Sequence, residues 1–110
     1  NDLVTQRYHA GAAGITAHRD HLRYRGLIGL LSLTGRARLY TCRDRRGSFP
    51  CEVDCTPGRL VLMPGPGFAG RDERPFHFLN AVSAERYSLG IRCDRDNAQG
   101  WLAGATGHAP

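Results

Sequence analysis

Residues 27–42 read LIGLLSLTGRARLYTC, and this stretch indicates the fold class. Its first half, residues 27–33, is rich in aliphatic side chains, and its second half, residues 36–42, predicts another strand. Thr34 and Gly35 lie between the halves and predict a turn, because glycine adopts the backbone angles that tight turns need. The stretch therefore predicts two short strands joined by a turn.

Further strand-like segments flank this stretch on both sides, and turn residues separate most of them. They are residues 4–8, 15–20, 52–55, 59–63, 76–82 and 86–92. Pro57-Gly58 and the Pro/Gly run 64–67 mark turns, and the short connection 83–85 is expected to join the last two strands. No segment has the period of an amphipathic helix. Seven or eight short strands without helices predict an all-β sandwich or barrel with a mouth where a small ligand can bind.

The composition is that of one globular domain. The chain has 110 residues, of which 41% are hydrophobic and 23% are charged, and this excludes a disordered tail. The sequence predicts a core over residues 1–94 and a C-terminal extension over 95–110, as a loose segment or a short helix. The longest apolar stretch, residues 27–33, is too short to cross a bilayer, so no membrane anchor or leader is expected.

All 15 basic side chains are arginines, and they exceed the 10 acidic ones by five. This surplus permits an anionic partner without requiring one. Residues 19–25 and 43–46 form either a basic patch or a solvated surface, since aspartates are interspersed among their arginines. The four cysteines are an even number, which would suit two disulfides, but their spacing matches no zinc site. We interpret them as reduced thiols of a cytoplasmic protein.

A metal-ligand pattern occurs at His18-Arg19-Asp20. Side chains two positions apart on an extended strand point to the same face, so His18 and Asp20 can reach one ion. His77, on the predicted strand 76–82, offers a third ligand 59 residues later. Two histidines and one carboxylate are the set that holds ferrous iron and leaves coordination positions open for oxygen chemistry. His21 is the competing ligand, but its odd offset directs it to the other face.

An arginine pattern follows in residues 86–92. The alternation of a strand places Arg86, Ser88 and Arg92 on one face, opposite an apolar set of side chains. An arginine that faces the cavity of a small barrel would be a buried unpaired charge unless an anion meets it. A dicarboxylate meets this need, because the planar guanidinium binds a carboxylate through two hydrogen bonds.

Together these segments resemble the iron(II)- and 2-oxoglutarate-dependent dioxygenases, and among them most closely the AlkB-type group. The resemblance rests on motifs in a fixed order and spans about residues 6–92. The motifs are Gln6-Arg7-Tyr8 with the following Gly-bearing loop, His18-Arg19-Asp20, the turn and strand 57–62, His77, and Arg86-x-Ser88-x-x-x-Arg92. The order of the motifs is more specific than any one of them.

The resemblance implies a double-stranded β-helix, a jelly-roll or cupin-like barrel. It implies that His18, Asp20 and His77 bind Fe(II). It also implies that five residues bind the co-substrate 2-oxoglutarate: Arg86 and Tyr8 at the far carboxylate, Arg92 near the chelating end, and Ser88 and Gln6 as supporting polar contacts. The implied reaction uses O₂ to hydroxylate or oxidatively demethylate a C–H substrate and releases succinate and CO₂.

Several alternatives stay open from the sequence. The substrate is a small molecule or a modified nucleobase, so nucleic acid is one candidate partner, and membrane is not. The second hypothesis is a non-catalytic cupin-like barrel that binds a metal or an anion, because a fold does not fix a function. A third is a degenerate fragment, since 110 residues make a small core.

Overall fold

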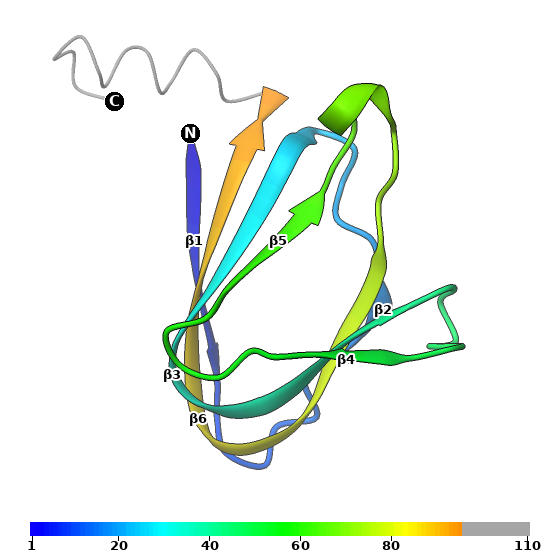
Figure 1. Cartoon of the computed structure of the whole chain (residues 1–110). Coiled ribbons are helices and arrows are strands. Elements are labelled where there is room, and N and C mark those ends of the chain that lie inside the picture. The colour runs from blue at the N-terminus through cyan, green and yellow to red at the C-terminus, as the bar shows by residue number, and fades with distance from the viewer. Residues whose placement is uncertain (96–110) are drawn as a thin grey trace, which may run out of the picture.

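The computed structural model describes residues 1–95, and in this range the regular secondary structure is almost entirely β-strand (Figure 1). Its strands are β1 (Asp2–Tyr8), β2 (Ile15–His18), β3 (Tyr24–Cys42), β4 (Cys51–Val53), β5 (Leu60–Pro64) and β6 (Phe76–Asp94), with one 3-10 turn, η1 (Phe68–Gly70). The predicted all-β class is confirmed. β6 ends next to the predicted domain boundary at residue 94, but the extension 95–110 lies almost wholly outside the described residues, so this boundary stays a prediction.

Two of the predicted turns are wrong. β3 runs without interruption through Thr34 and Gly35, and β6 runs through the expected connection at residues 83–85, so each is a single strand of 19 residues. The physical reason is that these positions bend the strands instead of reversing them. β3 and β6 pair with each other along their length, and this ladder continues past the bend. Eight expected strands therefore become six in residues 1–95.

The bend has a clear origin in the backbone. Gly35 has φ 89° and Ala81 has φ 52°, both in the left-handed region that a regular strand does not use. The register of the β3–β6 ladder shifts around the same place, between the pairs Ser32–Ser88 and Arg38–Asn80. Such bulges increase the twist of a strand and change its direction. The chain thus passes from one sheet to the other within a single strand.

Because both long strands bend, they belong to two four-stranded antiparallel sheets. The C-terminal half of β6 and the N-terminal half of β3 lie between β1 and β5, in the order β1-β6-β3-β5. The other halves lie between β2 and β4, in the order β2-β6-β3-β4. Figure 1 shows the two sheets curving around a shared interior. This arrangement is the predicted double-stranded β-helix barrel.

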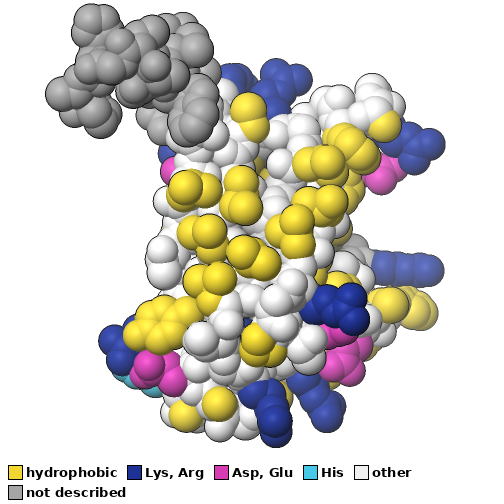
Figure 2. Space-filling view, turned by 60° about the vertical axis from the view of Figure 1, so that its left-hand side comes forward, with side chains coloured by type: hydrophobic (Ala, Val, Ile, Leu, Met, Phe, Trp, Pro, Cys, Tyr) yellow, Lys and Arg dark blue, Asp and Glu magenta, His cyan; other side chains and the backbone are white. Residues whose placement is uncertain are grey.

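The interior is lined by alternate residues of the long strands. Leu39, Leu79, Val82 and Cys55 form a buried cluster between the sheets. The outer face of the β1-β6-β3-β5 sheet also carries aliphatic side chains, among them Leu3, Leu62 and Ile91, which are exposed (Figure 2). One sheet therefore presents apolar residues on both faces, whereas antiparallel sheets commonly present polar residues to water.

The cysteines and the absence of a long apolar helix among the described residues complete the description of the fold. In residues 1–95 no helix has the length and apolar character needed to traverse a bilayer. The cysteines at positions 42, 51, 55 and 93 are all free, and Cys55 is buried in the core cluster.

Candidate metal centre and adjoining pocket

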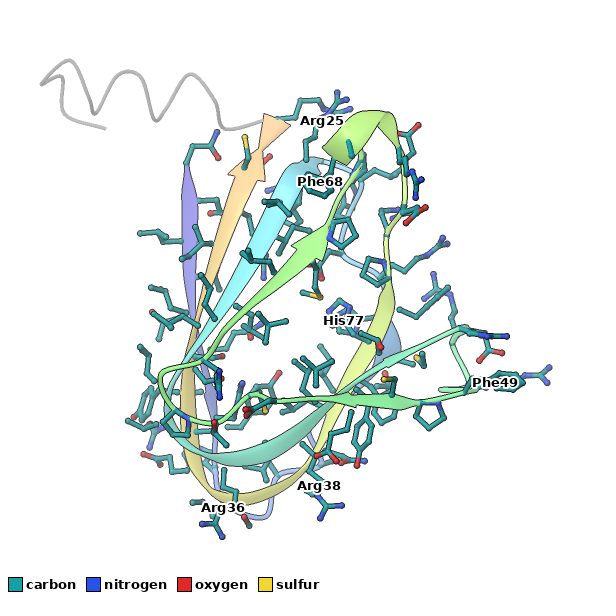
Figure 3. The ribbon with its side chains drawn as sticks, in the orientation of Figure 1. Arg25, Arg36, Arg38, Phe49, Phe68 and His77 are labelled. Carbon is teal, nitrogen blue, oxygen red and sulfur yellow. The ribbon has the colours of Figure 1, made fainter. Side chains whose placement is uncertain are left out.

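The two histidines and the carboxylate of the predicted metal site lie together between the sheets. His18 ends β2 and pairs across the ladder with His77 of β6, and Asp20 follows two residues after β2. One potential ligand atom from each of the three side chains lies within 4.8 Å of those of the other two. The imidazole of His77 points into the space between the two sheets (Figure 3). This is a geometry in which three side chains can share one cation.

Backbone carbonyls orient both imidazoles. The Nδ1 atom of His18 lies 2.8 Å from the carbonyl oxygen of Thr16, and the Nδ1 atom of His77 lies 3.1 Å from that of Pro75. A carbonyl oxygen only accepts hydrogen bonds, so each Nδ1 carries the proton and donates it. In the neutral rings each Nε2 then has a free lone pair, which is the arrangement typical of metal-binding histidines.

Both free nitrogens face the same carboxylate oxygen. The Nε2 atoms of His18 and His77 lie 3.7 Å and 3.4 Å from Oδ1 of Asp20. The side chains of His77 and Asp20 are only 10% and 15% exposed. Removal from water opposes the charge on each of these groups, but their mutual attraction and hydrogen bond outweigh it. As a result the pKa of Asp20 is lowered and the pKa of His77 is raised.

A pocket extends from this cluster into the interior of the barrel. Seven of the eight predicted site residues line it: Gln6, Tyr8, His18, Asp20, His77, Arg86 and Arg92. Ser88, the eighth, is fully buried and donates its hydroxyl to the Gln6 amide oxygen at 3.4 Å. Aliphatic side chains, including Ile28, Met63 and Leu79, form much of the remaining wall. The pocket therefore joins a group of potential metal ligands to a set of polar residues.

Arg86 is a buried charged residue that lines this pocket. It is 2% exposed, and its Nη2 donates to the hydroxyl of Ser32 at 3.1 Å. Among the ion pairs of residues 1–95 none includes Arg86, so its guanidinium is buried without a carboxylate partner. A buried charge without a counter-charge is costly, which makes this position suited to an anionic ligand.

Arg92 lies on the same wall of the pocket. Its Nε atom is buried without a hydrogen-bond partner, and its guanidinium carbon lies 4.6 Å from the ring centre of Tyr24. Burial raises the pKa of Asp20, but the hydrogen bond and charge of His77 lower it, and the positive charge of Arg92 adds a smaller lowering effect. The pocket thus contains a second guanidinium group whose hydrogen-bonding capacity the described protein does not fully use.

The other two histidines that the structure describes, His21 and His9, do not join the cluster. His21 is exposed, and its Nδ1 accepts the backbone N–H of Arg23, in line with its odd offset from Asp20. His9 lies near Glu85 on the surface. His108 and Trp101 lie outside the described residues. The expected strand 15–20 ends at His18, so Asp20 reaches the cluster from the segment after the strand.

The sequence did not indicate that Arg74 contacts the metal centre. Arg74 donates from Nη1 to the backbone carbonyl of Asp20 at 2.9 Å, across 54 residues of chain. No local pattern signals such a contact, because it depends on how the segment before β6 passes the end of β2. Ser32, the partner of Arg86, was missed for the same reason.

Comparisons with known proteins identify the fold but not the family. No protein-family model matches the sequence, and no curated protein matches it. One similar solved structure comes from a study of prolyl 4-hydroxylases from Phytophthora capsici, with a TM-score of 0.55 and 21% sequence identity. The match covers 96% of this chain and 39% of that chain, so this chain spans about two fifths of the other protein. At this identity the likeness establishes the shared fold alone.

Proposed function

We propose that this protein is an Fe(II)- and 2-oxoglutarate-dependent oxygenase. The observation that carries the proposal is that one pocket joins the His18, Asp20 and His77 cluster to the buried guanidinium of Arg86. A barrel that only binds a metal has no need of a buried cation without a counter-charge in the same pocket. The likeness in fold to a prolyl 4-hydroxylase, which by its name is a hydroxylating enzyme, supports the same class.

The cluster fits a ferrous ion. Two imidazole nitrogens and one carboxylate form the three-ligand set of non-haem iron oxygenases. Both imidazoles are held in the required tautomer by backbone carbonyls, and the ligand atoms lie within 4.8 Å of one another. The pKa of His77 is raised because its protonated ring is attracted to the Asp20 carboxylate, and a metal ion would take the place of the proton between the two groups. The donor set therefore agrees with the proposed ion.

The inner pocket fits a dicarboxylate. Arg86 offers a planar fork of donors suited to a carboxylate, and Tyr8, directly across the β1–β6 ladder, lines the same pocket. The Nε atom of Arg92, which is buried without a hydrogen-bond partner, offers a further donor to a second anionic group. Ser88 holds the Gln6 amide and so restricts its orientation. We assign to these five residues the binding of 2-oxoglutarate.

These residues would serve the reaction by binding, orienting and excluding water. If Fe(II), 2-oxoglutarate and O₂ were bound, they would supply the oxidising power to insert one oxygen atom into a C–H substrate, and the other oxygen atom would end in succinate as CO₂ leaves. Arg86 would neutralise the far carboxylate, and the aliphatic wall with Ile28 and Leu79 would keep water from the reacting groups. His18 and His77 each keep their proton at Nδ1, on a backbone carbonyl.

Finer assignments rest on the sequence pattern. The order of motifs over residues 6–92 supports an AlkB-type enzyme, and a small molecule or a modified nucleobase is the proposed substrate. Cytoplasmic location follows from the interpretation of the cysteines as reduced thiols. The proposed catalytic core covers residues 1–94, with 95–110 as an extension.

Anaerobic titration tests the proposal directly. Addition of Fe(II) and then 2-oxoglutarate to the intact protein should produce the weak visible charge-transfer band of the chelate. The H77A variant should lose the band because it loses a metal ligand. As a matched control, H9A removes a surface histidine beside Glu85 and should keep the band.

Turnover distinguishes the enzyme from a binding barrel. In the presence of O₂ the protein should release succinate slowly on its own, and faster with one member of a panel of methylated nucleotides and small molecules. If the folded protein binds Fe(II) but 2-oxoglutarate produces neither the band nor succinate, the protein is a non-catalytic barrel. If it binds no metal, the proposed class is wrong.

A further inference from the structure

We infer that Arg74 is a positioning residue that holds the Asp20 carboxylate in place to bind metal. The inference rests on the proposed metal site and extends it to a residue outside the ligand set. Arg74 lies in the segment before β6, far from Asp20 in sequence, and its side chain is half-buried. Its Nη1 donates to the backbone carbonyl of Asp20 at 2.9 Å.

Asp20 needs such an anchor because no strand holds it. β2 ends at His18, whose pairing with His77 is the last contact of the β2–β6 ladder. An aspartate side chain has only two rotatable bonds, so the position of its carboxylate follows the position of its backbone. A hydrogen bond to the Asp20 carbonyl therefore restricts the carboxylate almost as directly as a bond to the carboxylate itself.

The neighbour of Arg74 in sequence orients a second ligand. The carbonyl of Pro75 accepts the Nδ1 proton of His77 at 3.1 Å. Arg74 and Pro75 line one small cavity together with Asp20 and His77, on the side of Ile28 and Met63. The dipeptide thus fixes the relative placement of Asp20 and His77, which come from segments more than 50 residues apart. Proline at position 75 limits the backbone freedom of this support.

The guanidinium of Arg74 has no carboxylate partner among the described residues. Within residues 1–95 it has no ion pair, in contrast to Arg71, which lies three residues earlier and pairs with Glu73 on the surface. Groups that orient metal ligands from outside the ligand set typically change metal affinity by about 10–100-fold when they are removed. Arg74 should have an effect of this size, and Arg71 should have none.

The test is a Co²⁺ titration of the full chain, followed by visible absorption, for the wild type, R74M and R71M. R74M should bind Co²⁺ about 10–100-fold more weakly and show an altered spectrum at saturation. R71M, which loses the same charge in the same loop, should match the wild type. R74K keeps a donor and should give an intermediate affinity. If R74M does not fold, R74Q carries the same expectation with a smaller change.

The outcomes separate this inference from the proposed function. If the wild type binds Co²⁺ and D20N does not, but folded R74M or R74Q binds within about twofold of the wild type, then Arg74 does not position Asp20. The same conclusion follows if R71M is weakened as much as R74M. If the wild type itself does not bind Co²⁺, the metal site is wrong. Thermal unfolding of the metal-free variants distinguishes a positioning effect from general destabilisation.

Discussion

Gly35 of β3 and Glu85 of β6 lie so close that a Cβ atom on Gly35 would overlap the backbone carbonyl of Glu85. This contact is where the two long strands bend together. His77 and Arg86 lie on opposite sides of the bend in β6, yet both line one pocket. In a straight strand these residues would be about 30 Å apart, at about 3.3 Å per residue. The bend is therefore necessary to bring His77 and Arg86 to the same pocket.

G35A should destabilise the protein strongly. The substitution places a side chain at φ 89° and against the backbone of Glu85 and Arg86, so both strain and overlap oppose it. We expect the free energy of unfolding to fall by at least about 2 kcal/mol, measured by urea denaturation.

G58A is the matched control for this prediction. Gly58 has φ 90°, but a Cβ atom added there would meet no neighbouring atom within 4 Å, so only the backbone strain of about 1–2 kcal/mol applies. Equal losses in both variants would show that the close approach at Gly35 does not matter.

R86M should weaken the binding of 2-oxoglutarate strongly and leave metal binding intact. Loss of one partner of a buried charge pair costs about 2–5 kcal/mol, which corresponds to a Kd at least about 30-fold higher. The stability of the protein without ligand should change little or rise, because a buried cation without a carboxylate partner is removed.

Calorimetric titration of 2-oxoglutarate into the Mn²⁺-loaded protein measures this effect, and urea denaturation measures the stability. R7M is the control: Arg7 pairs with Glu85 on the surface, one position from Tyr8. If R86M binds 2-oxoglutarate as tightly as the wild type, Arg86 does not contribute to the binding site.

The metal-free protein should gain stability from the Asp20–His77 pair only within a window of pH. The pKa of His77 is raised in the folded state, so its contribution is complete below the unfolded value of about 6.5 and is lost as the pH rises through the folded pKa. The pKa of Asp20 is lowered, so its contribution is complete above about 3.9 and is lost as the pH falls through the folded pKa.

The difference in unfolding free energy between wild type and D20N, with chelator present, should therefore be largest between about pH 4 and pH 6.5. Denaturation at a series of pH values measures it. A difference that keeps growing above pH 7 would contradict the assigned direction of the His77 shift.

L79A should destabilise the protein, because Leu79 packs in the core of the barrel. Leu79 is 4% exposed and packs in the buried cluster, and truncation of such a leucine costs about 2–5 kcal/mol. Leu62 is 56% exposed on the outer face, so L62A should cost less than about 1 kcal/mol. Thermal or urea unfolding of both variants compares them, and a similar loss for L62A would mean that the outer face is covered in solution.

The sequence by itself determined the all-β class and the side chains that could supply a metal site. Alternation of apolar and polar residues is a local property, and so is the two-residue spacing of His18 and Asp20. Eight strand segments were predicted close to where strands occur. The two-residue period of a strand likewise predicted that Arg86 and Ser88 lie on the same face, and both side chains are buried.

Only the tertiary structure decided whether the predicted turns reverse or bend the chain, and which residues hold the site residues in place. Glycine at a positive φ is compatible with a turn or with a bend, and only the pairing partner, here β6 against Gly35, selects the bend. The Arg74–Asp20 and Arg86–Ser32 contacts each join residues 54 positions apart. Contacts of this kind leave no local pattern, because they depend on the path of the whole chain and not on the preference of any one segment.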